Sequence, residues 1–222
     1  MKGLRAAVLL AGAACFPPAL DESGRRCDVN RACGTGYVCF DGLCTLPEAV
    51  DAGPDNWLLN GSFEEVNDAG NPLFWRSLPP AQGGEIDSDT TVVRDGVRSV
   101  RVYSPDGGDQ AGVMVTLANE VRQTVFGQVW CARAWVRSST DAGFLVGLYL
   151  RERVDGGVTV AENTPNRIRV PAQWTLFEER YVAEGGDRLD VRVQHINRPG
   201  KQAQLWVDDV RLKRSATTEC SW

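Results

Sequence analysis

The chain has 222 residues, 43% apolar and 24% charged, which suits one sizeable folded domain and excludes a wholly disordered chain or a bundle of membrane helices. Its 24 basic and 29 acidic residues give a net charge of −5, so no nucleic-acid partner is expected. The single histidine, His195, excludes multi-histidine metal sites and leaves few candidates for the general base of an enzyme.

Residues 1–14 have the features of a signal peptide. Lys2 and Arg5 precede an apolar run that is too short to cross a membrane as a helix. Two cleavages compete: a lipoprotein cut before Cys15 and an ordinary cut after the small residues just upstream. The lipoprotein cut is preferred and makes Cys15 the lipid-modified residue of an exported bacterial envelope protein, on the outer membrane or cell surface. The ordinary cut would instead give a secreted protein.

A short segment at 27–44, which follows a tether at 15–26, is rich in cysteine and glycine. With Cys15 lipid-modified, six of the seven cysteines remain, an even number that can pair completely in an oxidising compartment. The segment has too few apolar residues for a core and resembles small cysteine-rich motifs of exported bacterial proteins. Its four cysteines are predicted to form disulfides, in any of three pairings: Cys27, Cys33, Cys39 and Cys44. A zinc site is the alternative, but Cys-x2-Cys pairs are absent.

Residues 45–56 read as a linker, because they combine prolines, a glycine and acids with little to bury. From residue 57 the pattern changes to short alternating apolar and polar runs, separated by Gly, Pro, Asp and Asn. These runs are predicted strands: 57–66, 90–94, 98–104, 112–118, 125–138, 143–153, 157–162, 166–170, 174–184, 188–196 and 203–213. Their spacing favours an antiparallel β-sandwich over 57–214, and no helical stripe competes with it.

The alternation also predicts which side chains leave the core. In 144–151 the residues Phe144, Val146, Leu148 and Leu150 share one face, so Tyr149 and Arg151 point outward. In 188–196 the outward set includes Arg192 and Gln194, while His195 follows the core-facing valines and is interpreted as structural. In 98–103 Tyr103 points outward with Arg101.

Two segments far apart in the sequence resemble carbohydrate-binding modules of families 4, 9 and 22. The first is Trp57-Leu58-Leu59-Asn60-Gly61-Ser62-Phe63-Glu64-Glu65, and the last is Ala203-Gln204-Leu205-Trp206-Val207-Asp208-Asp209-Val210-Arg211-Leu212. Landmarks between them also fit, at 96–102, 130–138 and 174–177. The resemblance spans about 57–213 and implies a jelly-roll β-sandwich, a galactose-binding-like fold.

A structural calcium ion is the cofactor that this resemblance implies. Carried onto this chain, its carboxylate ligands are Glu64 and Asp208. If the terminal strands pair, these carboxylates approach each other and need a cation or an arginine to neutralise them. The alternative is that they pair with arginines or are solvated.

The resemblance also implies a polysaccharide or glycan as partner. Proteins bind sugars by stacking aromatic rings on their apolar faces while polar side chains contact the hydroxyls. The outward residues that could serve this purpose are Tyr103, Trp135, Tyr149, Arg151, Arg192 and Gln194. The predicted function is a non-catalytic carbohydrate-binding module. The alternative is a structural or adhesive surface lipoprotein with a protein partner, because fold alone does not fix function.

The remaining cysteines, Cys131 and Cys220, are expected to form a disulfide that ties the C-terminal tail at 215–222 to the strand at 125–138. A buried free Cys131 is the alternative.

An enzyme is disfavoured because no catalytic motif is found, and because the neighbouring acids Glu178 and Glu179 must point to opposite faces of a strand. The oligomeric state is not predicted.

Overall fold

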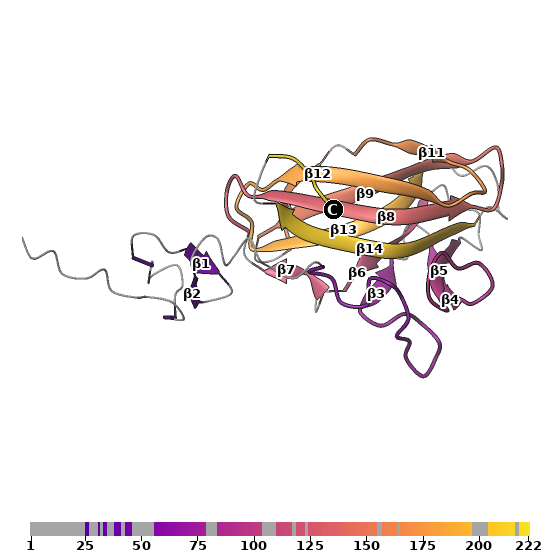
Figure 1. Cartoon of the computed structure of the whole chain (residues 1–222), viewed down its shortest axis with the longest axis horizontal. Coiled ribbons are helices and arrows are strands. Elements are labelled where there is room, and N and C mark those ends of the chain that lie inside the picture. The colour runs from indigo at the N-terminus through magenta and orange to yellow at the C-terminus, as the bar shows by residue number, and fades with distance from the viewer. Residues whose placement is uncertain are drawn as a thin grey trace, which may run out of the picture. The chain divides into compact units, whose positions relative to one another are not determined.

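Figure 1 shows the computed structural model of the chain, in which every labelled element is a strand. The described residues are 25, 26, 31, 33, 34, 38–40, 43–45, 56–78, 84–103, 110–116, 119–122, 124–154, 157–163, 165–196, 204–215 and 218–222. The chain divides into two compact units, Met1–Pro47 and Glu48–Trp222. Among these described residues no helix is long and apolar enough to cross a membrane.

The first unit contains a short antiparallel hairpin with a disulfide. Strand β1 (Val38–Phe40) pairs with β2 (Leu43–Thr45). Cys33 and Cys44 are joined by a disulfide, with their Cα atoms 5.6 Å apart, and the N–H of Cys44 donates to the carbonyl of Arg25 at 2.7 Å. The predicted disulfide character of this segment is therefore confirmed for one pair.

Several predictions concern residues outside the described part of the chain. They include the signal peptide at 1–14, the lipid-modified Cys15, and Cys27. Only the backbone of Cys39 is described, and of the predicted linker only residues 45 and 56. The second disulfide of the cysteine-rich segment therefore stays a prediction.

The larger sheet of the second unit has seven strands. Its main path runs through β10 (Thr159–Glu162), β9 (Phe144–Arg153), β13 (Arg188–Ile196), β6 (Gln110–Val115) and β3 (Trp75–Ser77). In addition β11 (Ile168–Val170) pairs with β9, and β7 (Val121–Arg122) pairs with β13. All of these pairings are antiparallel, and β9 and β13 form the long centre of the sheet.

The second sheet has five antiparallel strands. Their order is β12 (Thr175–Val182), β8 (Val129–Ser138), β14 (Leu205–Ser215), β5 (Ser99–Tyr103) and β4 (Glu85–Asp89). The register between β14 and β8 shifts between Asp208 and Arg211, where Asp209 has a positive φ of 43°. Such a bulge bends a strand and redirects its side chains.

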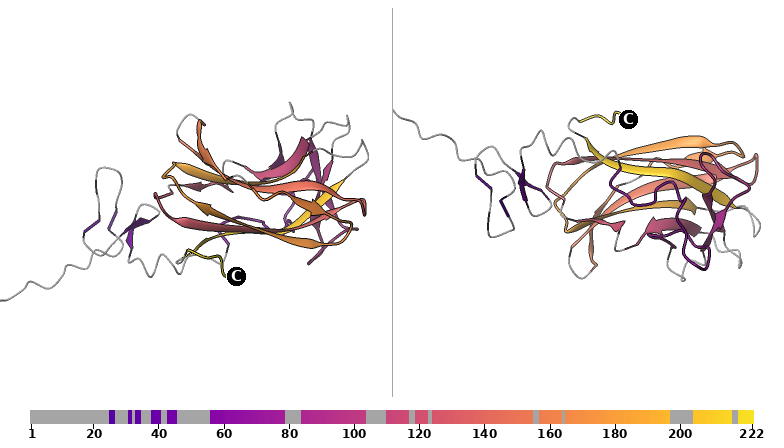
Figure 2. Two further views of the ribbon diagram at one scale, coloured as in Figure 1. Left: turned by 90° about the horizontal axis from the view of Figure 1, so that it is seen from above. Right: turned by 60° about the horizontal axis from the view of Figure 1, so that its bottom comes forward.

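The two sheets lie face to face as two layers around one apolar core, as Figure 2 shows. The predicted alternation supplies this core: Val100, Val102, Val146, Leu148, Leu150, Val191 and Val193 are all fully buried. Fold class is thus confirmed as an all-β sandwich of the jelly-roll type.

The first and last segments of the second unit lie side by side, as the resemblance implies. The N–H of Trp57 donates to the carbonyl of Leu212 at 2.7 Å, and the N–H of Val210 donates to the carbonyl of Gly61 at 2.8 Å. A Cβ atom on Gly61 would lie 2.1 Å from the carbonyl oxygen of Val210, so glycine is required for this close approach. The two ends of the domain therefore close one body.

Two predicted strands are not strands, and three observed strands of the second unit were not predicted. The run 57–66 forms turns, in which Asn60 and Phe63 have positive φ angles of 49° and 60°, and 90–94 forms bends. Leu58 and Phe63 fill the core from a loop and Trp57 packs against it, so the apolar pattern of this segment mimicked a strand. The unpredicted strands are β3, β4 and β7. β4 is an acidic edge strand, Glu-Ile-Asp-Ser-Asp, that lacks the apolar alternation.

Candidate functional site

The outer face of the seven-stranded sheet brings together four of the predicted sugar-contacting residues: Tyr149, Arg151, Arg192 and Gln194. Arg192 lies opposite Tyr149 in the register, and Gln194 lies opposite Gly147 on one side and Gly112 on the other. Since the intervening Val191 and Val193 are fully buried, this set points away from the core.

The ring of Tyr149 lies flat along this face. A Cβ atom on Gly147 would lie only 2.6 Å from Cε2 of the ring, so the absence of a side chain at Gly147 leaves room for it. The guanidinium of Arg192 lies over the ring, 4.6 Å from its centroid, and donates to Glu162 at 2.6 Å. Tyr149 is consequently only 7% exposed, and the surface above it is the Arg192 guanidinium rather than a bare ring.

Ion pairs fix the neighbouring arginines. Arg151 donates twice to the buried Asp190, at 2.9 and 2.7 Å, and Arg153 approaches the same carboxylate oxygen at 3.1 Å. Arg153 also pairs with the buried Glu120, which Arg188 approaches at 3.5 Å. These buried carboxylates hold the guanidinium groups in place at the surface.

Sequence reasoning missed part of this face. Met114 lies opposite Arg192 and beside Arg76 of β3, and the side chain of Leu78 lies over Gly112. β3 is too short to produce an alternating signal, which explains the omission of Arg76. The pairing of Glu162 with Arg192 joins residues 30 positions apart, and no local pattern indicates it.

Tyr103 and Trp135 lie on the other sheet. Tyr103 of β5 donates its hydroxyl to Glu85 at 2.8 Å, and this hydrogen bond raises the pKa of the phenol. Trp135 of β8 has the guanidinium of Arg94 4.3 Å from its ring centroid. The six predicted residues therefore divide between two sheets, four on one and two on the other, and do not form a single surface.

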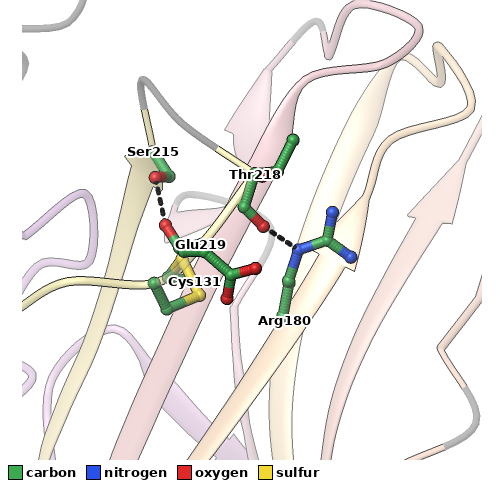
Figure 3. Close-up of a disulfide and its surroundings, with 6 residues drawn as sticks. Cys131, Arg180, Ser215, Thr218 and Glu219 are labelled. Carbon is green, nitrogen blue, oxygen red and sulfur yellow. Dashed lines mark hydrogen bonds between the residues drawn. A yellow bond between two sulfur atoms is a disulfide. The ribbon is translucent and has the colours of Figure 1, made fainter.

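The C-terminal tail lies against the five-stranded sheet, as Figure 3 shows. Cys131 of β8 forms a disulfide with Cys220, which confirms the predicted pairing. Arg180 donates to the carbonyl of Thr218 at 2.5 Å. The final residue, Trp222, contacts two cations, Arg133 and Lys213, each 4.7 Å from its ring centroid. Part of this sheet's outer surface is thus covered. The seven-stranded sheet, which holds four of the six predicted residues, is the better candidate for a binding face.

The hydrogen bond from Trp206 to Asp89 makes the stability of the five-stranded sheet depend on pH. Burial alone would raise the pKa of Asp89, but hydrogen bonds from Thr91, Trp206 and Val92 outweigh it and lower that pKa to about 2. A depressed carboxyl pKa stabilises the fold above about pH 4, and this stabilisation is lost as the pH falls towards 2. We expect Asp89→Asn to remove about 1 kcal/mol, since solvent screens this partly exposed group, and to flatten urea-unfolding stability between pH 4 and 2. An unchanged pH profile would contradict this.

Glu64 and Asp208, the predicted calcium ligands, both reach the loop at 90–98. Glu64 accepts hydrogen bonds from the N–H groups of Val97 and Arg98 at 3.0 and 3.2 Å. Asp208 is 1% exposed and accepts from Arg94 and Asp95 at 3.0 and 3.3 Å, and burial raises its pKa to about 6.

The groups that face these two carboxylates are N–H donors, whereas calcium takes oxygen ligands. Among the described residues no three His, Cys, Asp or Glu side chains gather as a metal site would require. In this arrangement the amides of the loop donate hydrogen bonds to both carboxylates. Calcium at Glu64 and Asp208 therefore stays a prediction.

Other titratable residues lie on the strand faces that the alternation of apolar and polar residues predicted. His195 is fully buried, edge-on to Phe144 with 5.5 Å between the ring centroids. Glu178 is exposed, whereas Glu179 is 8% exposed and accepts from the N–H of Asn166 at 2.7 Å. The two carboxylates thus point to opposite faces of β12, as predicted.

No protein-family model and no curated protein matches the sequence. Solved structures do share the fold. The CBM22-1 xylan-binding domain of Paenibacillus barcinonensis Xyn10C matches with a TM-score of 0.52 and 16% identity, over 71% of this chain and 94% of that domain. The TmCBM61 module, solved in complex with β-1,4-galactotriose, matches with a TM-score of 0.51 and 18% identity, over 73% and 100%.

Enzymes with this fold are also found. The Stig cyclase Fisc of Fischerella sp. TAU matches with a TM-score of 0.50 and 16% identity, over 71% of this chain and 96% of the cyclase. Of a much longer match, the enzymatically active domain of bacteriophage CBA120 tailspike protein 4, this chain covers 21%. At these identities the likeness shows a common fold, so activity has to be argued from the residues of this chain.

Proposed function

We propose that the domain at 57–214 is a non-catalytic carbohydrate-binding module that binds a polysaccharide or glycan on the outer face of its seven-stranded sheet. The module is displayed on the bacterial envelope, anchored through a lipid on Cys15. The signal-peptide features of 1–14 and the two disulfides, which are typical of oxidising compartments, support export.

One observation carries the binding proposal: polar groups are held in fixed positions around an aromatic ring on the outer face of the sheet. Tyr149 lies flat on Gly147, Arg192 covers its ring, and Gln194 stands in the adjacent row. A glycan lying on this face meets guanidinium and amide donors, so hydrogen bonds to its hydroxyl groups contribute more than stacking. The fold shared with the xylan-binding domain and the galactotriose complex supports carbohydrate binding by this domain.

Retention of the purified protein in gels containing a panel of plant, microbial and host polysaccharides tests the proposal. We expect Gln194→Ala to weaken binding about fivefold, as for one lost hydrogen bond. Gly147→Ala should weaken it further, because the new Cβ displaces the Tyr149 ring and, with it, Arg192.

Leu176→Ala is the matched control, since Leu176 is exposed on the five-stranded sheet, and it should bind like the parent chain. Loss of binding in Tyr103→Ala, without loss in Gly147→Ala, would move the site to the other sheet. Retention on no polymer at all would contradict the proposal and favour the adhesive alternative with a protein partner.

A further inference from the structure

The two sheets differ sharply in charge. The strands of the five-stranded sheet contain seven basic and seven acidic residues, which cancel. The strands of the seven-stranded sheet contain only three acids, Glu152, Glu162 and Asp190. Against these stand seven bases: Arg76, Arg122, Arg151, Arg153, Arg169, Arg188 and Arg192. The proposed binding sheet therefore carries a net +4 in a chain whose net charge is −5.

Three of these arginines form one row across the sheet. Arg188 of β13 lies opposite Arg122 of β7 on one side and opposite Arg153 of β9 on the other. Like charges directly opposite each other destabilise a sheet unless they are neutralised. Glu120 contacts Arg153 and Arg188, and Asp190 contacts Arg153, so the excess of positive charge in this row lies at Arg122, its exposed end.

Two exposed arginines have no acidic partner. Within the part of the chain that the structure describes, Arg76 and Arg122 form no ion pair. A second row places Arg76 beside Met114, Arg192 and Tyr149. Alternate residues on a strand are about 7 Å apart, so the Cα atoms of Arg188 and Arg192 lie about 13 Å from each other, and the two rows can contact successive anionic groups along an extended chain.

We infer that this face binds an acidic polysaccharide, one that carries carboxylate or sulfate groups, in preference to a neutral one. The inference rests on the proposed function and names its ligand class. A guanidinium group presents paired N–H donors that match the oxygens of a carboxylate or sulfate, so the excess arginines provide charge and geometry together. Glu162 accepts a hydrogen bond from the Arg192 guanidinium and therefore competes with an acidic ligand for this group.

Matched pairs of polymers test this with the purified full-length protein. The pairs are polygalacturonate and its methyl ester, and dextran sulfate and dextran. We expect the charged member of at least one pair to bind ten times or more tightly than its neutral partner, and its affinity to fall steeply between about 20 and 500 mM NaCl as the charges are screened. The two pairs distinguish carboxylate from sulfate recognition.

Variants locate the effect. Arg76→Gln and Arg122→Gln should each weaken acidic binding about threefold and together about tenfold, whereas Glu162→Gln should strengthen it about threefold by releasing Arg192. Arg211→Gln on β14 is the matched control and should leave affinity unchanged. Equal binding of charged and neutral partners, or full affinity in the double variant, would overturn the inference while leaving glycan binding intact. Binding to no polymer would overturn both.

Discussion

Removal of the Cys131–Cys220 disulfide is expected to lower the free energy of unfolding of the second unit by about 4 to 5 kcal/mol. The bond closes a segment with a sequence separation of 89, and the loss of chain entropy in the unfolded state grows with the length of the closed loop. For a domain of this size we expect the melting temperature to fall by 10 °C or more, measured by tryptophan fluorescence on the double variant Cys131→Ala, Cys220→Ala.

The tail contacts beside the disulfide require their own control. Arg180 donates to the carbonyl of Thr218, and Trp222 contacts Arg133 and Lys213, so some stability could come from these groups rather than from the cross-link. Trp222→Ala in the oxidised protein isolates that part and should cost about 1 kcal/mol, because the ring is partly exposed. If Trp222→Ala were as damaging as loss of both cysteines, the entropic explanation would be wrong.

Reduction provides a second measurement. A reductant should destabilise the parent chain by as much as the two cysteine substitutions do. In the double cysteine variant, the same reductant should leave the stability of the second unit unchanged. The other described disulfide, Cys33–Cys44, belongs to the first unit, and the tryptophans of the chain all lie in the second. Tryptophan fluorescence therefore reports the unfolding of the second unit alone.

Alternation predicted the long strands well, because their inward residues meet one continuous core. In β9 and β13 the predicted inward residues are fully buried or nearly so, and Tyr149, Arg151, Arg192 and Gln194 share the predicted outer face. A period of two tells which side of its own sheet a residue occupies. It does not tell which strands belong to which sheet, and so it could not separate Tyr103 and Trp135 from the other four.

Long-range pairing explains the remaining differences. β4 was missed because its acidic residues are held by pairing with β5: Asp87 of β4 accepts from Arg101 of β5 at 2.9 and 2.5 Å. The run at 57–66 was overpredicted because a loop can bury apolar residues when side chains satisfy its backbone. Asn60 does so, donating to the carbonyls of Glu65 and Leu73 and accepting from the N–H of Glu65.

The second large effect is expected at Glu152, a fully buried carboxyl group on the inner face of β9. One of its oxygens accepts from the Thr124 hydroxyl and from the N–H of Gly186 at 3.2 Å. The other accepts from the Tyr181 hydroxyl at 2.9 Å and the N–H of Glu184 at 2.6 Å. Four donors from three segments of the chain thus converge on one side chain, which fastens one end of the sandwich.

Glu152→Gln keeps the shape and replaces one acceptor oxygen with an NH2 donor, so two of the four buried donors lose their partner. We expect a loss of about 3 kcal/mol in the free energy of unfolding, measured by urea titration, because each buried donor left unpaired costs about 1 to 3 kcal/mol. Glu178→Gln, at an exposed position on β12, is the matched control and should change stability by no more than about 0.5 kcal/mol.

Tyr181→Phe separates the hydrogen-bond network from a general effect of charge. It removes one donor and should cost about 1 kcal/mol, and the cost of the Glu152→Gln, Tyr181→Phe double variant should be less than the sum of the two single costs, since both changes break the same contact. Burial and the bond to Glu152 raise the pKa of Tyr181, so the unfolded chain ionises first and stability falls above about pH 10. Tyr181→Phe should weaken that alkaline loss. Additive costs together with an unchanged alkaline limb would show that Glu152 acts through its charge alone.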